Sequence, residues 1–356
     1  MATHMRHALV QRPRDKRPVW IGVLVTVLVL ILSVSGWVWN RAQNAVNSAT
    51  EGQGGAAIDI LVPKALTNEG SGRVNLLLAG SSFDDTDHDG ATLTDSIIVA
   101  SMDLETKHVT LISIPRDLWV QYDNRSMKIN AVFPAAAHGT QGVQDLGNWR
   151  MGMAALGGVV ERVTGLHVDQ YALVGYTALK DAVDALGGVD VTISTNDPRG
   201  IYDPNTDLRL PSGPNHLDGA TALKLARARN HKEAGKAAYG INSDWGRGDN
   251  QRMILLALMQ KAKSSPALAN PATLVSLFDT VSRNVRTDLT VSQIRRAFDL
   301  ATKVERTESI SIKGDATHEL LANYTDGNTG ADAIIPAAGR YDYTDIWKFV
   351  EEACSS

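Results

Sequence analysis

The chain has 356 residues, with 35 lysines and arginines against 39 aspartates and glutamates, so its formal net charge is −4. Five basic residues and one acidic residue stand before the first long apolar run and carry +4, which leaves −8 for everything after it. An acidic domain lacks the broad basic face that duplex nucleic acid requires, and the single cysteine, Cys354, excludes an intrachain disulfide, so neither a nucleic-acid partner nor a disulfide scaffold is expected.

Residues 19–39 carry no formal charge and are rich in Val, Leu and Ile. At about 1.5 Å per residue, a helix of this length spans the roughly 30 Å hydrocarbon core of a bilayer. Trp20, Trp37 and Trp39 lie at its two ends, where amphipathic rings favour the headgroup region. Since the flanking positive charge lies almost entirely on the amino side, we predict a single-pass type II protein of the cell membrane. Residues 1–18 are then a cytoplasmic basic tail, and the folded domain after the apolar run is extracellular.

A cleaved signal peptide is the alternative interpretation of the same apolar run. Its apolar core is usually about 7 to 15 residues long and is followed by a small-x-small cleavage site, which Asn40-Arg41-Ala42-Gln43 does not offer. Residues 40–72 are rich in Asn, Ala, Gly, Gln and Ser, so we expect a flexible extracellular linker there. The folded part begins near Arg73 and is long enough for a sizeable core.

Three short apolar runs early in the folded part have strand length, are rich in β-branched residues and are bounded by polar or glycine-rich segments. They are Val74–Ala79, Ile97–Met102 and Val109–Ile114. We expect them to be neighbouring strands of one sheet. Two later runs, Tyr171–Val174 and Val189–Ile193, bracket a helical pattern at Thr177–Leu186 that stops at two glycines, which predicts a strand, helix, strand unit.

Four further segments have the periodicity of helices, and together with the strands they predict an α/β sheet with helical cover. They are Gly219–Ala226, Asn250–Lys263, Ala272–Val281 and Val291–Thr302, the last of which follows a Thr290 N-cap. We divide the folded part into a main domain at 73–265 and a mainly helical carboxyl-terminal part at 266–356 that packs on the same domain.

A strand ends at Ser113-Ile114-Pro115-Arg116-Asp117, because Pro115 cannot donate a hydrogen bond to a neighbouring strand. Arg116 and Asp117 therefore project from the carboxyl end of a strand, the edge at which open α/β sheets bind ligands. The alternative is a surface pair that closes a turn. Lys128-Ile129-Asn130 adds a cation and an amide that could return to the same rim.

Further arginines stand at predicted helix ends. Arg227 and Arg229 can face one anion only if the helix ends near Arg227, because positions two apart on a helix differ by about 200°. Arg247 and Gln251 share a face at the amino end of the next helix, where free N–H groups and the helix dipole favour an anion. Since a planar guanidinium binds two phosphate oxygens at once, these residues predict a phosphate-type anion site. The alternatives are an ordinary basic helix end for the first pair and a simple N-cap by Asp244 for the second.

A pyrophosphate held by several arginines usually also needs a divalent cation, and Mg²⁺ takes one or two carboxylates together with phosphate oxygens. Asp95 lies at the start of the second strand, in Thr94-Asp95-Ser96. Upstream, the residues from Asp85 to Gly90 copy the first half of an EF-hand loop, but position twelve is Ser96 rather than Glu. We expect Asp95 to be a metal ligand. Asp85 is either the second ligand or part of a solvated acidic loop.

Taken together, these segments resemble the LytR-CpsA-Psr (LCP) family of bacterial cell-wall phosphotransferases over roughly 74–263. The order of the motifs carries the resemblance. They are Asn75-Leu76-Leu77-Leu78-Ala79-Gly80, Thr94-Asp95-Ser96, Ser113-Ile114-Pro115-Arg116-Asp117, Lys128-Ile129-Asn130, Asp184-Ala185-Leu186-Gly187-Gly188-Val189, Leu217-Asp218-Gly219, Arg227-Ala228-Arg229, and Gly246-Arg247 with Gln251. The resemblance implies a three-layer α/β/α domain around a central mixed β-sheet, with a polyprenyl pyrophosphate lipid in an apolar groove and its head group on the arginines.

The resemblance further implies an activity. A phosphoglycan of teichoic acid, capsule or arabinogalactan type would be transferred from its polyprenyl carrier to a muramyl hydroxyl of peptidoglycan, with Mg²⁺ assisting. By position, Asp95 is similar to the metal-binding aspartate of the family. The residues assigned to pyrophosphate binding are Arg116, Lys128, Arg227, Arg229, Arg247, Gln251 and Arg252. The sequence departs from the family pattern at two positions. Ser81-Ser82 stands where the family often has an acidic residue. Asn250 stands where the family often has a second arginine, and Arg252 would compensate for that arginine.

Phosphoryl transfer needs charge neutralisation and in-line positioning more than covalent help. We expect Arg116 and Arg229 to be catalytic, with Asp117 and Asp244 as candidates for the general base or as groups that only orient an arginine. Two other functions stay open. One is an anchored receptor for polyprenyl-linked wall polymers without catalysis, which Ser82 slightly favours, and the other is a hydrolase that releases polyprenyl phosphate to water.

Overall fold

The computed structural model describes residues 63–84, 92–137, 146–195, 197–228, 232–233, 236–240, 244–264, 284–314 and 319–355. At a few positions in helices and short strands, 244–248 among them, it describes the backbone alone. The predicted membrane-spanning residues 19–39 and the predicted helix at Ala272–Val281 lie outside this part of the chain. Among the residues described, no helix combines the length and the apolar character needed to cross a bilayer.

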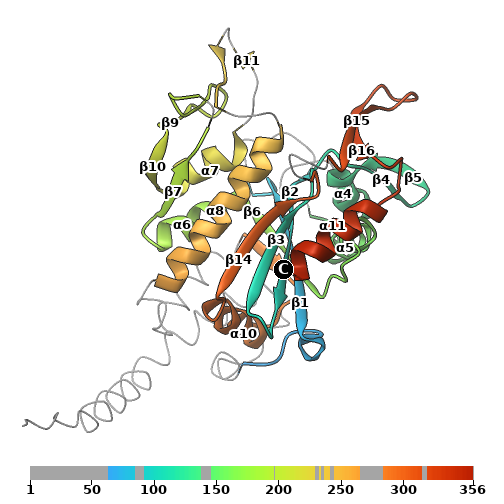
Figure 1. The fold of residues 1–356 in the computed structure, drawn as a ribbon, viewed down its shortest axis with the longest axis horizontal. Helices are drawn as coiled ribbons and strands as arrows, with labels where there is room; N and C mark the ends of the chain where they lie inside the picture. Colours follow the sequence, from blue (N-terminus) through green and yellow to red (C-terminus); the bar gives the residue numbers. More distant parts are fainter. Residues whose placement is uncertain are drawn as a thin grey trace, which may run out of the picture. The chain divides into compact units, whose positions relative to one another are not determined.

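A mixed sheet of six strands forms the centre of the domain, in the order β13-β6-β1-β2-β3-β14 (Figure 1). Its strands are β1 (Arg73–Ser81), β2 (Thr94–Asp103), β3 (His108–Ser113), β6 (Gln170–Gly175), β13 (Val285–Thr287) and β14 (Arg306–Ser311). The three early strands are antiparallel neighbours, β6 runs parallel to β1, β14 runs parallel to β3, and β13 runs antiparallel to β6. The predicted α/β fold with a mixed sheet is confirmed, and so is the prediction that the three early runs are neighbours.

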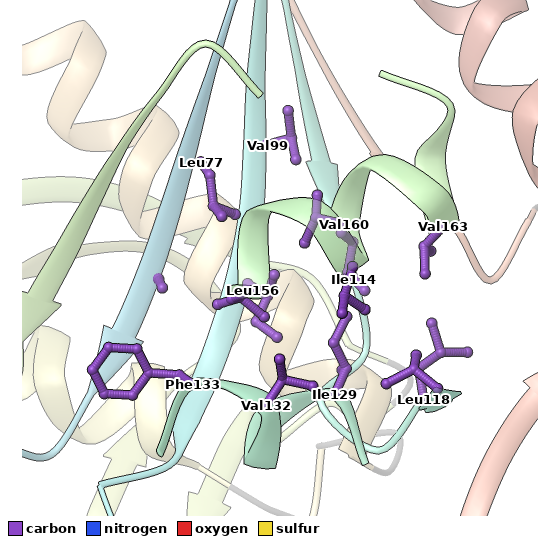
Figure 2. Packing of buried hydrophobic residues seen from close by; sticks show 14 of the residues in the cluster. Leu77, Val99, Ile114, Leu118, Ile129, Val132, Phe133, Leu156, Val160 and Val163 are labelled. Atoms are coloured by element: carbon purple, nitrogen blue, oxygen red, sulfur yellow. The ribbon is translucent and has the colours of Figure 1, made fainter. Parts of the chain in front are cut away.

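Three helices cover one face of this sheet. They are α4 (Val132–Ala137), α5 (Trp149–Thr164) and α11 (Thr344–Ser355). Leu77 and Val99 of the sheet meet Phe133 and Leu156 of the helices in the core that Figure 2 shows. Helix α5 can approach Phe133 because residue 152 is a glycine, and a Cβ atom on Gly152 would lie 2.8 Å from Cδ2 of the Phe133 ring.

Four other helices lie on the opposite side. They are α6 (Tyr176–Ala185), α7 (Gly219–Arg227), α8 (Asp244–Ser264) and α10 (Val291–Thr302). Successive side chains of a strand point to opposite faces. Val99 therefore joins the core under α5, whereas Ile98 packs with Leu255 and Leu256 of α8. Figure 1 shows α5 and α8 on opposite sides of the sheet.

The strand after α6 leaves the central sheet. It is β7 (Val189–Ile193), which pairs with β10 (Gly213–Leu217) in a separate antiparallel pair, so the predicted strand, helix, strand unit does not return to the sheet. Residues of β7 alternate between buried and exposed, as suits a strand with one face in solvent. Strands β1 and β2, by contrast, contribute apolar side chains to cores on both faces of the sheet.

Short elements connect and extend these layers. The antiparallel pairs are β4 (Trp119–Tyr122) with β5 (Arg125–Lys128), β8 (Ile201–Asp203) with β9 (Leu208–Leu210), β11 (Lys232–Glu233) with β12 (Lys236–Ala237), and β15 (Leu321–Thr325) with β16 (Asp332–Pro336). Two 3₁₀ helices, η1 (Glu69–Ser71) and η2 (Ile129–Ala131), precede β1 and follow β5. The η2 turn matters for function because it places Asn130 beside β2.

Within residues 266–356, for which we predict a mainly helical part, the described portion contains strands as well as helices. That portion adds β13 and β14 to the central sheet and forms the β15–β16 pair, besides α10 and α11. Sequence periodicity misses β14 because it lies at the sheet edge and reads Arg-Thr-Glu-Ser-Ile-Ser, without an apolar run. Helix α10 is confirmed, with a capping box between Thr290 and Gln293.

Candidate functional site

Charged residues gather at one edge of the central sheet. The carboxyl ends of β1, β3 and β6 and the amino end of β2 meet there, because β2 runs antiparallel to its two neighbours. Strand β3 ends at Ser113, so Arg116 and Asp117 follow it directly, as Pro115 predicts. Asp95 is the second residue of β2 and lies at the same edge. Arg116, Asp117 and Asp95 therefore meet at one rim of the sheet.

A β-bulge determines where Asp95 points. Gly80 pairs with Ser96 and Ser81 pairs with Thr94, which leaves Asp95 without an opposite residue on β1. Regular alternation would send Asp95 and Ser96 to opposite faces of the sheet. An extra residue at a bulge breaks this alternation and redirects a side chain. As a result, both Asp95 and Ser96 line the same cavity.

The rim residues form a chain of alternating charges. The Arg116 guanidinium donates to Oδ1 of Asp95 at 2.8 Å and, through Nε, to Oδ2 of Asp117 at 3.3 Å. Lys128 donates to the other oxygen of Asp117 at 2.7 Å, and the Asn130 amide reaches Oδ1 of Asp95 at 3.5 Å. The side chains of Asp95, Arg116 and Asp117 are only 16–20% exposed, which strengthens these interactions relative to surface ion pairs. The structure thus brings Asp95, Arg116, Asp117 and Lys128 together.

A cavity of about 440 Å³ opens beside this chain, between the sheet and helices α6, α7 and α8. Its polar lining comes from Asp95, Ser96, Tyr176, Asn205, Arg227 and Gln251. Its apolar lining includes Leu78, Ile98, Leu179, Ile254, Leu255 and Leu258. Within β2, α6 and α8 the polar residue stands at the rim and the apolar residues follow further along the element. The cavity therefore has a polar mouth and an apolar body.

The end of α7 brings Arg227 into this mouth. The helix ends at Arg227, and Ala228 is extended, which is the condition under which Arg227 and Arg229 could face one anion. The Arg227 guanidinium lies over the ring of Tyr176, 4.9 Å from the ring centroid. Gln251 of α8 donates to the carbonyl oxygen of Ala226 at 3.2 Å and so ties α8 to the end of α7. Arg227 and Gln251 therefore share one cavity with Asp95, as predicted.

Arg252 does not join these residues. It stands next to Gln251 on α8 but is turned by about 100°, and it does not line the cavity. It is 9% exposed and pairs with Asp249, and burial lowers the pKa of its guanidinium below the ordinary value. Its position is that of a buried helix residue, which corrects the prediction of a compensating pyrophosphate ligand.

The remaining predicted residues lie where the structure does not describe side chains. Arg229 and Asp85 fall outside the described residues, and Asp244 and Arg247 belong to the first turn of α8, where only the backbone is described. Their assignments to pyrophosphate, metal or proton transfer therefore stay predictions. The backbone does place residues 244–248 at the amino end of α8, one turn before Gln251.

Tyr176 and Asn205 also line the cavity, although no sequence motif marks them as site residues. Asn205 comes from the turn between β8 and β9, which no motif marked as part of the site. Tyr176 begins α6 directly after the end of β6, so an aromatic residue at the carboxyl end of a strand was its only signal. Both residues reach the cavity through packing between segments that are distant in the sequence, and neither segment alone shows this.

Asp84 has a structural task at the same rim. Its two carboxylate oxygens accept hydrogen bonds from the backbone N–H groups of Tyr176 at 2.8 Å and Thr177 at 2.9 Å. This carboxylate fits only because residue 175 is a glycine, since a Cβ atom on Gly175 would lie 2.1 Å from Oδ2 of Asp84. Asp84 therefore stabilises the amino end of α6, as an N-cap does.

The rim offers limited ligands for a divalent cation. Among the residues that the structure describes, Asp95 is the one carboxylate in the cavity lining, and there is no group of three or more metal-binding side chains. Nearby, Ser81 of β1 pairs with Thr94 of β2, and its buried hydroxyl has no hydrogen-bond partner among the described residues. Mg²⁺ often binds through one or two carboxylates and takes its other ligands from phosphate oxygens and water. These residues fit an ion that arrives with a phosphate substrate.

Comparison with known proteins gives consistent matches over most of the chain. The LytR_cpsA_psr family model matches residues 38–334. The probable cell wall biosynthesis protein LcpB of Corynebacterium glutamicum is 30% identical over 338 residues, which cover 94% of this chain and 72% of that protein. The polyisoprenyl-teichoic acid–peptidoglycan teichoic acid transferase TagU of Oceanobacillus iheyensis is 27% identical over 287 residues, which cover 80% of this chain and 81% of that protein.

A solved structure shares the fold. It is that of the LytR-CPS2A-psr family protein YwtF (TagT) with bound octaprenyl pyrophosphate lipid, with a TM-score of 0.55 and 19% identity over 81% of this chain and 92% of that one. The family model covers well over half of the sequence, and the rim motifs lie within the matched residues. The chain therefore belongs to the LytR_cpsA_psr family.

Proposed function

We propose that the protein transfers a phosphoglycan from a polyprenyl pyrophosphate carrier to a muramyl hydroxyl of peptidoglycan. It does so as a type II membrane protein anchored by residues 19–39, with its three-layer α/β/α domain outside the cell. One observation carries the proposal: an apolar cavity ends in a polar mouth that holds Asp95, Arg227 and Gln251, with Arg116 bonded to Asp95. A polyprenyl pyrophosphate matches this cavity, because its apolar chain suits the apolar body and its diphosphate head suits the polar mouth.

The names of relatives point to the same chemistry. TagU is a teichoic acid transferase by name, and the YwtF (TagT) structure contains octaprenyl pyrophosphate. The cavity volume of about 440 Å³ takes part of a polyprenyl chain, so the rest of the lipid extends beyond the described cavity. Teichoic acid, capsule and arabinogalactan polymers share the polyprenyl pyrophosphate head that this mouth recognises.

The reaction breaks one phosphorus–oxygen bond and forms another. The muramyl hydroxyl oxygen attacks the phosphorus on the glycan side, and the bond from that phosphorus to the bridging oxygen breaks, so polyprenyl phosphate leaves. Arg116 and Arg227 neutralise the phosphate charge and hold the pyrophosphate in line, and Gln251 supports the mouth. Mg²⁺, held by Asp95, would supply further charge neutralisation at the phosphate oxygens. Arg229 and Arg247 complete the clamp.

Asp117 is better suited to orient cations than to accept the proton. Its two carboxylate oxygens already accept hydrogen bonds from Arg116 and Lys128. Protonation of this carboxylate would weaken its hydrogen bonds to these cations. Asp244, at the amino end of α8, is therefore the preferred candidate to take the proton from the attacking hydroxyl.

A single assay separates the proposal from its alternatives. The full chain is incubated with a labelled polyprenyl-pyrophosphate glycan, with and without peptidoglycan oligomers and Mg²⁺. Label on the oligomer is the expected result and identifies a transferase. Free phosphoglycan in the presence of the oligomer would identify a hydrolase, and intact lipid retained on the protein would identify a receptor; either outcome would refute the proposal.

A further inference from the structure

Tyr176 occupies the point where three elements of the cavity meet. It is the first residue of α6, it follows the end of β6, and it lies beside the last residue of α7. Both Tyr176 and Arg227 line the cavity. The proposed transfer gives Arg227 a task at the pyrophosphate but assigns none to the aromatic ring next to it.

The contact between the two side chains has the geometry of a cation–π interaction. The central carbon of the Arg227 guanidinium lies 4.9 Å from the centroid of the Tyr176 ring, within the roughly 6 Å over which a ring face attracts a cation. A guanidinium that stacks on a ring keeps its N–H groups in the plane and available at the edges. Stacking therefore fixes the plane of the group and leaves donors for phosphate oxygens.

The ring itself is held in place from behind. Asp84 accepts a hydrogen bond from the backbone N–H of Tyr176, and Gly175 leaves room for that carboxylate. The first turn of α6 is thus anchored to the loop after β1. Arg227, by contrast, is the last residue of its helix, and Ala228 after it is already extended. A side chain at a helix end is less restricted than one inside a helix, so an outside support has a clear purpose.

We propose, on the basis of the proposed function, that Tyr176 is a positioning residue that holds the Arg227 guanidinium at the mouth of the cavity for the diphosphate head of the lipid. The ring face supplies this effect, and the hydroxyl is not required. Tyr176 then acts through Arg227, so its removal costs affinity for the pyrophosphate and not for the apolar chain.

A double-mutant cycle on the full chain tests the proposal, with octaprenyl pyrophosphate as the binding probe. Tyr176→Leu should weaken binding by about five- to tenfold, the range expected for a partly desolvated cation–π contact. In an Arg227→Gln background the same substitution should change the affinity by less than about twofold, because the partner is gone. Tyr176→Phe, which keeps the ring, should stay close to the wild type. Equal losses in both backgrounds, or a loss in Phe as large as in Leu, would refute the proposal.

Octaprenol, which lacks the pyrophosphate, separates positioning from a simple apolar wall. Its affinity should be the same for the wild type and for Tyr176→Leu, and a matching loss would show that the ring only lines the cavity. Octaprenol binding also reports that the cavity of the variant is folded. Failure of the wild type to bind octaprenyl pyrophosphate would instead refute the proposed function, and with it this role.

A control uses another arginine–tyrosine contact, in which Arg340 also donates a hydrogen bond to the tyrosine hydroxyl. Arg340 lies over the ring of Tyr324, 4.8 Å from the centroid, and Tyr324 does not line the cavity. Tyr324→Leu should leave octaprenyl pyrophosphate binding at the wild-type level. A loss equal to that of Tyr176→Leu would mean that removing such a stack acts through general stability and not through position, which would also overturn the inference.

Discussion

Replacing Arg116 by glutamine tests the centre of the site. The substitution removes the donor at 2.8 Å from Asp95 and the donor at 3.3 Å from Asp117. Lys128 still donates to Asp117 at 2.7 Å, so the loss falls mainly on the interaction with Asp95. A hydrogen bond to a charged group contributes about 1.5 to 3 kcal/mol, and Arg116 and Asp95 are 18% and 20% exposed, so the free energy of unfolding should fall by about 2 kcal/mol.

The effect on the rate should be much larger than the effect on folding. Removing one preorganised donor that stabilises transition-state charge lowers kcat by about 10²- to 10³-fold. We therefore expect Arg116→Gln to remain folded and to lose transfer by that factor. The assay is label transfer from a polyprenyl-pyrophosphate glycan to peptidoglycan oligomers by the full chain, beside urea denaturation of the same sample.

The control is a similar substitution on a neighbouring hairpin. Arg125 on β5 pairs with Asp123 at 3.3 Å but is 71% exposed and does not line the cavity. Arg125→Gln should change neither stability nor transfer measurably, because exposed ion pairs contribute little. If Arg116→Gln turned over within about threefold of the wild type, the guanidinium would have no part in stabilising the transition state, and the assignment of the rim would be wrong.

Three further predictions concern the metal, the groove and pH. Asp95→Asn should sharply raise the Mg²⁺ concentration needed for half-maximal transfer. Asp84→Asn should lower the unfolding temperature without changing that Mg²⁺ concentration. The reverse pattern would make Asp84 the metal ligand and Asp95 the structural residue. Leu258→Asp should weaken octaprenyl pyrophosphate binding by more than about tenfold, because it places an unpaired charge in the apolar body of the cavity. Burial lowers the pKa of His108 below its ordinary value of 6.5, so the unfolded chain takes up a proton that the folded chain resists as pH falls through that value. Urea denaturation should therefore show stability declining from about pH 7 to pH 5, and less so in His108→Gln.

The strands and helices that carry the site could be predicted because their own residues specify them. β1, β2 and β3 are apolar and β-branched, and α10 has its cap in the sequence. The position of Arg116 could also be predicted, because Pro115 ends the strand before it. In each case the signal lies within a few residues of the feature.

Features that depend on distant contacts could not be predicted. The bulge that turns Asp95 into the cavity depends on how β1 and β2 pair, and neither strand shows it alone. Helix α5 was not predicted because its three glycines obscure the helical pattern, yet Gly152 is needed where the helix passes Phe133. Arg252 has the residue type of a phosphate ligand, but its angular position on α8 turns it away from the cavity.

Strand β14 has a consequence for the growing chain. It covers the outer edge of β3 and pairs residue 108 with residue 306, so that edge stays open until most of the polypeptide has been made. An open strand edge exposes unpaired N–H and C=O groups that can associate with another molecule, and pairing across such a distance is slow. Products truncated before Arg306 should therefore aggregate during synthesis, even though Asp95, Arg116 and Arg227 are all present in them.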